Sequence, residues 1–144
     1  MVAYADTSFL YSLYGHDANS EQARTMGNTL KVPLALTPLQ RHELRNAFRL
    51  AVFRKVMTEE RCKAVLSQIE ADTKAGVLVE TPVSWAEAYS EAEALSAAHS
   101  KNLGTRGFDV LHVATAIALG TKKFLTFDGR QKALALKAGL KVKP

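Results

Sequence analysis

Short apolar runs alternate along the chain with longer segments in which apolar residues recur every three to four positions. The short runs predict strands at residues 2–5, 33–37, 77–80 and 123–127, with a further short strand at 140–142. The periodic segments predict helices at residues 7–14, 19–30, 38–55, 59–74, 84–101, 108–119 and 130–138. Short apolar strands alternating with amphipathic helices are typical of an α/β fold, in which helices cover both sides of a parallel sheet.

Three of these helices have recognisable start signals. Thr37 is a capping hydroxyl followed by a proline at the first helical position. Thr58 is followed by two glutamates, which suit the positive end of the helix dipole. Ser84 and Glu87 have the spacing of a capping box. We therefore expect helices to begin directly after residues 37, 58 and 84.

Length and composition limit the class of protein. A chain of 144 residues predicts one domain spanning residues 1–144. Cys62 is the only cysteine, so no disulfide can form within the chain, and a reducing, cytoplasmic location is expected. No apolar run reaches the length of a membrane span, and the start of the chain lacks a basic leader. The net charge of +5 favours a polyanionic or acidic partner.

Four acidic residues are candidates for a functional site. Asp6 and Asp128 each follow a predicted strand and precede a helix, where the ordinary explanation is helix capping. Glu43 falls at the border of an apolar helical face, where an ion pair with arginine would explain it. Asp109 lies in the first turn of an apolar helix, where the helix dipole favours an acid. Each residue alone has a purely structural explanation.

Taken together, the four acids indicate a metal site. If the sheet is parallel, Asp6 and Asp128 end strands at the same edge, and the helices carrying the other two can flank it. Converging carboxylates repel one another unless cations are present. Hard oxygen ligands fit Mg²⁺ or Mn²⁺, which can activate a water and neutralise charge on a phosphodiester.

The sequence resembles the PIN-domain ribonucleases, particularly the VapC-type toxins of toxin–antitoxin pairs. The resemblance covers the whole chain and lies in "YADTSFL", "RHELRNAF", "RGFDVLHVATAIALG" and "FLTFDGR", in this order. It implies a PIN-like three-layer α/β/α sandwich with a short, mostly parallel central sheet, and an acidic Mg²⁺ or Mn²⁺ site. It also implies endoribonuclease activity on RNA, a homodimer, and inhibition by a cognate antitoxin protein.

The resemblance also assigns roles to residues of this chain. Asp6, Glu43 and Asp109 correspond to the main metal-binding carboxylates and Asp128 to the fourth acid. The resemblance also points to three supporting residues (Ser8, Thr126 and His112) and to Arg106 as a candidate phosphate contact. Separately, the helical pattern places Arg41, Arg45 and Arg49 in one stripe, a candidate surface for RNA or for an acidic tail of the antitoxin. The ordinary structural alternatives are a helix cap for Ser8, strand propensity for Thr126, core packing for His112, and solvated cations for the arginines.

Two other functions are consistent with the sequence, and a third is disfavoured. One is a PIN nuclease for RNA maturation or structured DNA, which an added domain would favour. Another is a non-catalytic binding protein whose acids are only caps and ion pairs. A phosphotransfer fold also places an aspartate after its first strand, but no second acid follows Asp6 by two residues and no suitably placed lysine is found. Metal binding discriminates the nuclease from the binding protein.

Overall fold

The apolar runs form two short parallel sheets in the computed structural model, which describes residues 1–144. The first sheet has the order β1–β4–β5, with β1 at Tyr4–Ala5, β4 at Lys123–Leu125 and β5 at Lys141–Lys143. The second pairs β2 at Leu34–Leu36 with β3 at Leu78–Glu80. Every strand pairing is parallel, as the sequence predicted.

The chain divides into two compact units. The first comprises Ala3–Asp6 and Pro82–Pro144, together with Met1, and contains the β1–β4–β5 sheet. The second comprises Thr7–Thr81, together with Val2, and contains the β2–β3 pair. The chain thus crosses from the first unit to the second directly after Asp6.

Helices follow the strands in the first unit. They are α5 (Trp85–Leu95), the π-helical turn Ser96–Ser100, α6 (Lys101–Leu103), α7 (Gly107–Ala118) and α8 (Gly129–Lys137). Helix α5 packs along α7, whose residues from Asp109 to Ala116 are all buried. The rings of Tyr4 and Phe124, from neighbouring strands, stack with centroids 5.5 Å apart. This apolar packing holds the ends of β1 and β4 in a fixed position.

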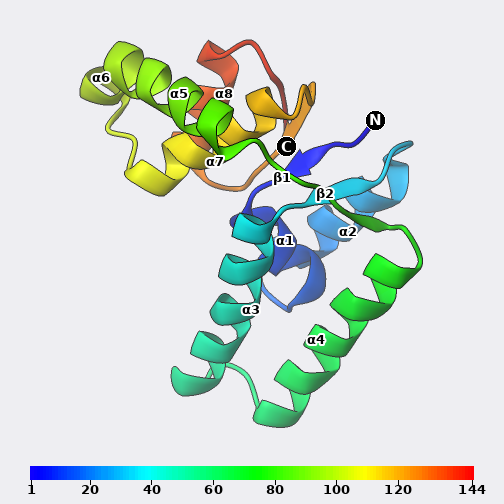
Figure 1. Cartoon of the computed structure of the whole chain (residues 1–144). Coiled ribbons are helices and arrows are strands. Elements are labelled where there is room, and N and C mark those ends of the chain that lie inside the picture. The colour runs from blue at the N-terminus through cyan, green and yellow to red at the C-terminus, as the bar shows by residue number, and fades with distance from the viewer. The chain divides into compact units, whose positions relative to one another are not determined.

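The second unit is mainly helical. It contains α1 (Thr7–Tyr14), α2 (Ser20–Thr29), α3 (Pro38–Phe53) and α4 (Glu59–Lys74). Helices α3 and α4 run antiparallel and are joined by a short connection (Figure 1). Phe48 of α3 is buried and its ring stacks on Tyr11 of α1, with centroids 4.7 Å apart. This contact holds α3, the helix that carries Glu43, against α1.

Two of the three predicted helix starts have the expected capping contacts. The Thr37 hydroxyl accepts a hydrogen bond from the Gln40 N–H (3.2 Å), and the Gln40 side chain accepts one from the Thr37 N–H (2.7 Å). The Thr58 hydroxyl accepts from the Arg61 N–H (3.1 Å). Ser84 precedes α5, but its side chain makes no capping bond, so the predicted capping box is wrong. Helix α5 therefore begins without a side-chain cap.

Other differences lie where tertiary contacts override the local pattern. Leu50 is 37% exposed and Phe53 is 82% exposed, although both are apolar residues of α3. The long helix predicted at residues 84–101 is interrupted by the π-helical turn. The rings of Trp85 and Tyr89, four positions apart on α5, pack with centroids 6.5 Å apart. None of the helices is both long and apolar enough to cross a membrane.

Candidate metal and catalytic site

The parallel pairing of β1 with β4 brings two of the predicted acids to one sheet edge. Tyr4 lies opposite Phe124 and Ala5 opposite Leu125, and the Asp6 N–H donates to the Leu125 carbonyl (3.0 Å). Asp128 follows β4 at the same carboxyl-terminal edge. Polar groups gather at such edges in parallel sheets because the strands end there together. The expected juxtaposition of these two strand ends is confirmed.

Thr126 connects the two strand ends. Its hydroxyl donates to Oδ2 of Asp6 (2.5 Å) across 120 positions of the sequence, and it accepts a hydrogen bond from the Asp128 N–H (2.9 Å). Both Asp6 and Thr126 are almost completely buried. Strand propensity alone does not explain this threonine, since its hydroxyl fixes the orientation of one acid and the backbone of another.

The two carboxylate oxygens of Asp128 have different partners. Oδ1 caps α8 by accepting from the N–H groups of Arg130 (2.9 Å) and Gln131 (3.0 Å), so the capping explanation is confirmed for this oxygen. Oδ2 lies 3.6 Å from the guanidinium of Arg106. The second oxygen is therefore held toward a cation instead of toward the helix.

Asp109 is a buried carboxylate held by several donors. Oδ2 accepts from the Arg106 backbone N–H (3.0 Å) and from its Nε (3.1 Å), while Oδ1 accepts from Nε2 of Gln131 (3.2 Å). The Arg106 guanidinium also reaches Oδ1 at 3.4 Å. Arg106 is thus an ion-pair partner of both Asp109 and Asp128, although 64% of its side chain remains exposed.

These contacts determine the protonation of Asp109. Burial raises the pKa of its carboxyl, but the hydrogen bonds and charge of Arg106, together with the hydrogen bond from Gln131, outweigh burial. The pKa of Asp109 therefore lies below its ordinary value, and the group is ionised at neutral pH. The same hydrogen bond and charge raise the pKa of Arg106, which stays protonated.

Sequence reasoning did not identify Gln131 as a site residue. It stands three positions after Asp128, the spacing of an N-cap residue and its capping-box partner. That spacing was available as a signal, but it indicates only a helix start. The contact of its side chain with Asp109, 22 positions away, comes from the packing of α8 on α7.

His112 has the position expected for a packing histidine. It lies one turn after Asp109 on α7, is 1% exposed, and its Nδ1 is 2.7 Å from the Tyr4 hydroxyl. The two rings pack edge to face with centroids 5.9 Å apart. A ring buried to this degree does not contact an RNA phosphate, so its contribution is to hold α7 against β1.

The remaining predicted acid and the serine belong to the second unit. Oε1 of Glu43 accepts a hydrogen bond from the Thr7 hydroxyl (2.9 Å), and Thr7 is the residue directly after Asp6 in the chain. Glu43 is half-buried, as expected for the border of an apolar helical face. Ser8 lies in the first turn of α1 and is also half-buried.

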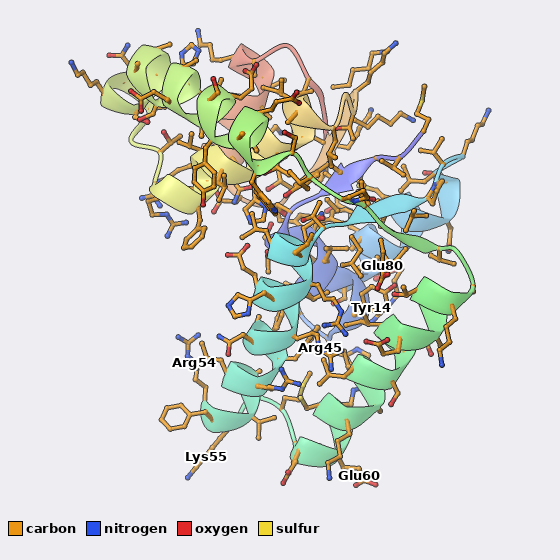
Figure 2. All side chains as sticks on the ribbon, viewed as in Figure 1. Tyr14, Arg45, Arg54, Lys55, Glu60 and Glu80 are labelled. Carbon is orange, nitrogen blue, oxygen red and sulfur yellow. The ribbon has the colours of Figure 1, made fainter.

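The arginines of α3 differ in their contacts. Arg41 (2.9 Å) and Arg45 (3.1 Å) both pair with the same carboxylate oxygen of Glu70 on α4, and Figure 2 shows Arg45 pointing from α3 toward α4. Arg49, one turn further along, is exposed and has no acidic partner. A surface cavity of about 310 Å³ is lined by Pro38, His42, Asn46 and these three arginines. Its lining is cationic and suits an anion.

The chemistry of the first unit fits a divalent cation. The carboxylates of Asp6, Asp109 and Asp128 are hard oxygen donors of the kind that bind Mg²⁺ and Mn²⁺. The buried Oε1 of Gln131 has no hydrogen-bond partner. No three Asp, Glu, His or Cys side chains are grouped closely enough to hold one ion. Arg106 supplies positive charge to two of the carboxylates.

The fold and these acids together define the class of protein. The family model of the PIN domain matches residues 3–137, which span both compact units, and the chain belongs to this family. The three-layer α/β/α class predicted from the sequence is the fold of that family. No curated protein matches the chain in sequence.

Solved structures show the same fold. The structure of the toxin VapC20 from Mycobacterium tuberculosis, which cleaves the sarcin–ricin loop, matches with a TM-score of 0.69 and 21% sequence identity over 99% of each chain. The protein PAE2754 from Pyrobaculum aerophilum matches with a TM-score of 0.54 and 18% identity, over 98% of this chain and 83% of that one. Both likenesses extend along nearly the whole chain.

Proposed function

We propose that this protein is a divalent-metal-dependent endoribonuclease that acts as the toxin of a toxin–antitoxin pair. The observation that carries the proposal is a chain of contacts: Thr126 links Asp6 to Asp128 at the carboxyl ends of β1 and β4, and Arg106 links Asp128 to Asp109 of α7. When ionised, three carboxylates and one guanidinium leave two net negative charges, which a divalent cation would balance. Membership of the PIN-domain family and likeness to a VapC toxin support nuclease activity.

The proposed ligands are Asp6, Asp109 and Asp128, with Glu43 as a further carboxylate. The assignment of Glu43 rests on its place in the family motif "RHELRNAF", and within the second unit its carboxylate accepts a hydrogen bond from Thr7. A bound Mg²⁺ or Mn²⁺ would supply an activated water at neutral pH and neutralise charge on the phosphoryl oxygens. Thr126 would keep Oδ2 of Asp6 in one orientation, so that less reorganisation is needed when substrate binds.

Arg106 has two roles in this proposal. In the metal-free protein its guanidinium neutralises Asp109 and Asp128. Once released from them, it is a planar donor beside the carboxylates, suited to bidentate contact with a phosphate of the RNA. We assign hydrolysis that leaves 5′-phosphate and 3′-hydroxyl ends, in a cytoplasmic homodimer that a cognate antitoxin inhibits. The exposed arginine surface of α3 supports a polyanionic substrate.

Cleavage of RNA by the purified protein tests the proposal. Total cellular RNA is incubated with protein in Mg²⁺ or in EDTA, and new 5′ ends are mapped by sequencing. The sarcin–ricin loop is included as a defined substrate because VapC20 cleaves it. We expect discrete, metal-dependent cuts from the wild type and none from Asp6→Asn, because the lost charge serves the cation.

A matched control separates loss of the site from loss of the fold. Glu60→Gln removes one exposed carboxylate at the start of α4 (Figure 2) and should cleave like the wild type. Retained activity in a well-folded Asp6→Asn protein would contradict the mechanism. If the wild type neither cleaves RNA nor binds Mn²⁺, the acids are caps and ion pairs and a non-catalytic binding protein is the better description. Cuts confined to precursor RNA or structured DNA would favour the maturation nuclease.

A further inference from the structure

Gln131 has a feature that helix capping does not explain. Its side chain is 7% exposed, yet Oε1 is buried without a hydrogen-bond partner. In native structures almost all buried polar atoms have a hydrogen-bond partner, because burial removes their hydrogen bonds to water and an unpaired atom gains none in return. This oxygen lies in the same amide group as the nitrogen that contacts Asp109. The unpaired acceptor therefore belongs to the neighbourhood of the carboxylates.

The orientation of the amide follows from its surroundings. Nε2 donates to Oδ1 of Asp109 at 3.2 Å. Rotating the amide by half a turn would place Oε1 against that carboxylate oxygen, and two acceptors would then repel each other. Only the observed orientation therefore places a donor against this carboxylate oxygen. The partner that Oε1 lacks must consequently be a hydrogen-bond donor.

Gln131 also departs from the behaviour of an ordinary capping-box residue. In a capping box the side chain at this position returns to the N–H of the N-cap residue. Here the Asp128 N–H is already taken by the Thr126 hydroxyl (2.9 Å), and the Gln131 side chain extends to Asp109 on another helix. Its own N–H donates to Oδ1 of Asp128 (3.0 Å). One residue thus contacts two of the proposed ligands.

We propose that Gln131 is a positioning residue of the metal site, a role that rests on the function proposed above. Nε2 holds Asp109 in the orientation that binds the cation. Oε1 accepts a hydrogen bond from a water in the coordination shell of that cation, which gives the unpaired acceptor its donor. Replacing a residue that orients a ligand in this way typically lowers metal affinity by about 10- to 100-fold.

Two substitutions with opposite electrostatic consequences test the role. Gln131→Leu removes both the donor to Asp109 and the acceptor. Gln131→Glu keeps the acceptor, but places a second carboxylate against Asp109 until a cation binds. Mn²⁺ affinity of the full chain is measured by calorimetry, and the metal-induced shift in melting temperature is measured alongside it. These readouts do not depend on RNA cleavage.

We expect Gln131→Leu to bind Mn²⁺ about 10-fold more weakly, or worse, with a smaller metal-induced shift than the wild type. Gln131→Glu should be less stable than the wild type in EDTA but should bind Mn²⁺ at least as tightly and show a larger shift. Thr115→Val is the control, because this buried hydroxyl donates only to the Leu111 carbonyl of its own helix (2.7 Å). It should leave Mn²⁺ affinity unchanged.

The outcomes separate this inference from the proposed nuclease. Wild-type Mn²⁺ affinity in Gln131→Leu overturns the role of Gln131 and leaves the nuclease in place. Weaker Mn²⁺ binding in both Gln131 variants indicates a merely structural residue and also overturns it. Absence of Mn²⁺ binding by the wild type overturns both proposals. If Gln131→Leu does not fold, the direction of change in Gln131→Glu decides alone.

Discussion

At the scale of single residues, the role of each acidic side chain depends on the hydrogen-bond donors that surround its carboxylate. Asp109 stands where the helix dipole favours an acid, and the sequence offered no further partner. In the structure it is ionised because Arg106 and Gln131 donate to it from both sides. Asp128 is a genuine cap, but through one oxygen only. Helix capping and metal binding are therefore compatible roles for one carboxylate.

Replacement of Arg106 should affect stability and metal binding in opposite directions. In EDTA at neutral pH, Arg106→Gln should lower the melting temperature, because Asp109 and Asp128 lose their shared cation. The same change should tighten Mn²⁺ binding, since the ion no longer competes with a guanidinium. Calorimetry measures both effects. Arg54→Gln, an exposed arginine at the end of α3 (Figure 2), is the control and should change neither.

The pH dependence of this variant follows from the lowered pKa of Asp109. A depressed folded-state pKa contributes stability that is present above the unfolded value, about 3.9, and is lost as pH falls through the folded value. The difference in melting temperature between wild type and Arg106→Gln should thus be constant near neutrality and shrink below about pH 4. A difference that persists unchanged into acid would contradict the assigned ion pair.

At the scale of elements, two helix starts that look alike in sequence differ in structure. Thr37 and Gln40 exchange reciprocal hydrogen bonds and are both buried, whereas the Ser84 side chain makes no capping bond. Local patterns identified where both helices begin, because an N-terminal polar residue and apolar periodicity are properties of short segments. They did not reveal which hydroxyl points toward the free N–H groups, because the path of the preceding chain decides that.

Alanine at these two positions should separate the two cases. Thr37→Ala should lower the free energy of unfolding by about 1–2 kcal/mol, the usual effect of losing a capping hydroxyl. Ser84→Ala should change it by less than about 0.5 kcal/mol, as at a surface position without a cap. Urea denaturation of both variants measures the difference. An equal loss at both sites would show that the Ser84 hydroxyl does cap α5.

At the scale of the whole molecule, the basic residues behind the net charge of +5 differ in whether an acidic side chain already pairs with them. Arg41 and Arg45 share Glu70, so part of their charge is already neutralised. Arg49 lies in the same cationic cavity without an acidic partner. The sequence showed the stripe of arginines but not this difference, because Glu70 is 25 and 29 positions away on another helix.

Arg49 should therefore contribute more to RNA affinity than an equally exposed lysine elsewhere. In an Asp6→Asn background, which should bind RNA without cutting it, Arg49→Ala should weaken binding and reduce the slope of log affinity against log salt by about one. Lys63→Ala on α4 removes the same charge and should have a smaller effect. Fluorescence anisotropy across a salt series measures both. Equal losses would mean that only net charge attracts the RNA.

The sequence by itself determined the strands, the helices, the parallel sheet class and the four acids. Hydrophobic periodicity and turn residues act over a few positions, so short segments carry that information. Only the tertiary structure decided that Thr126 holds Asp6, that Arg106 bridges Asp109 and Asp128, and that Gln131 contacts both. Those partners depend on how α7 and α8 pack beside the ends of β1 and β4, and packing brings together residues that no local pattern relates.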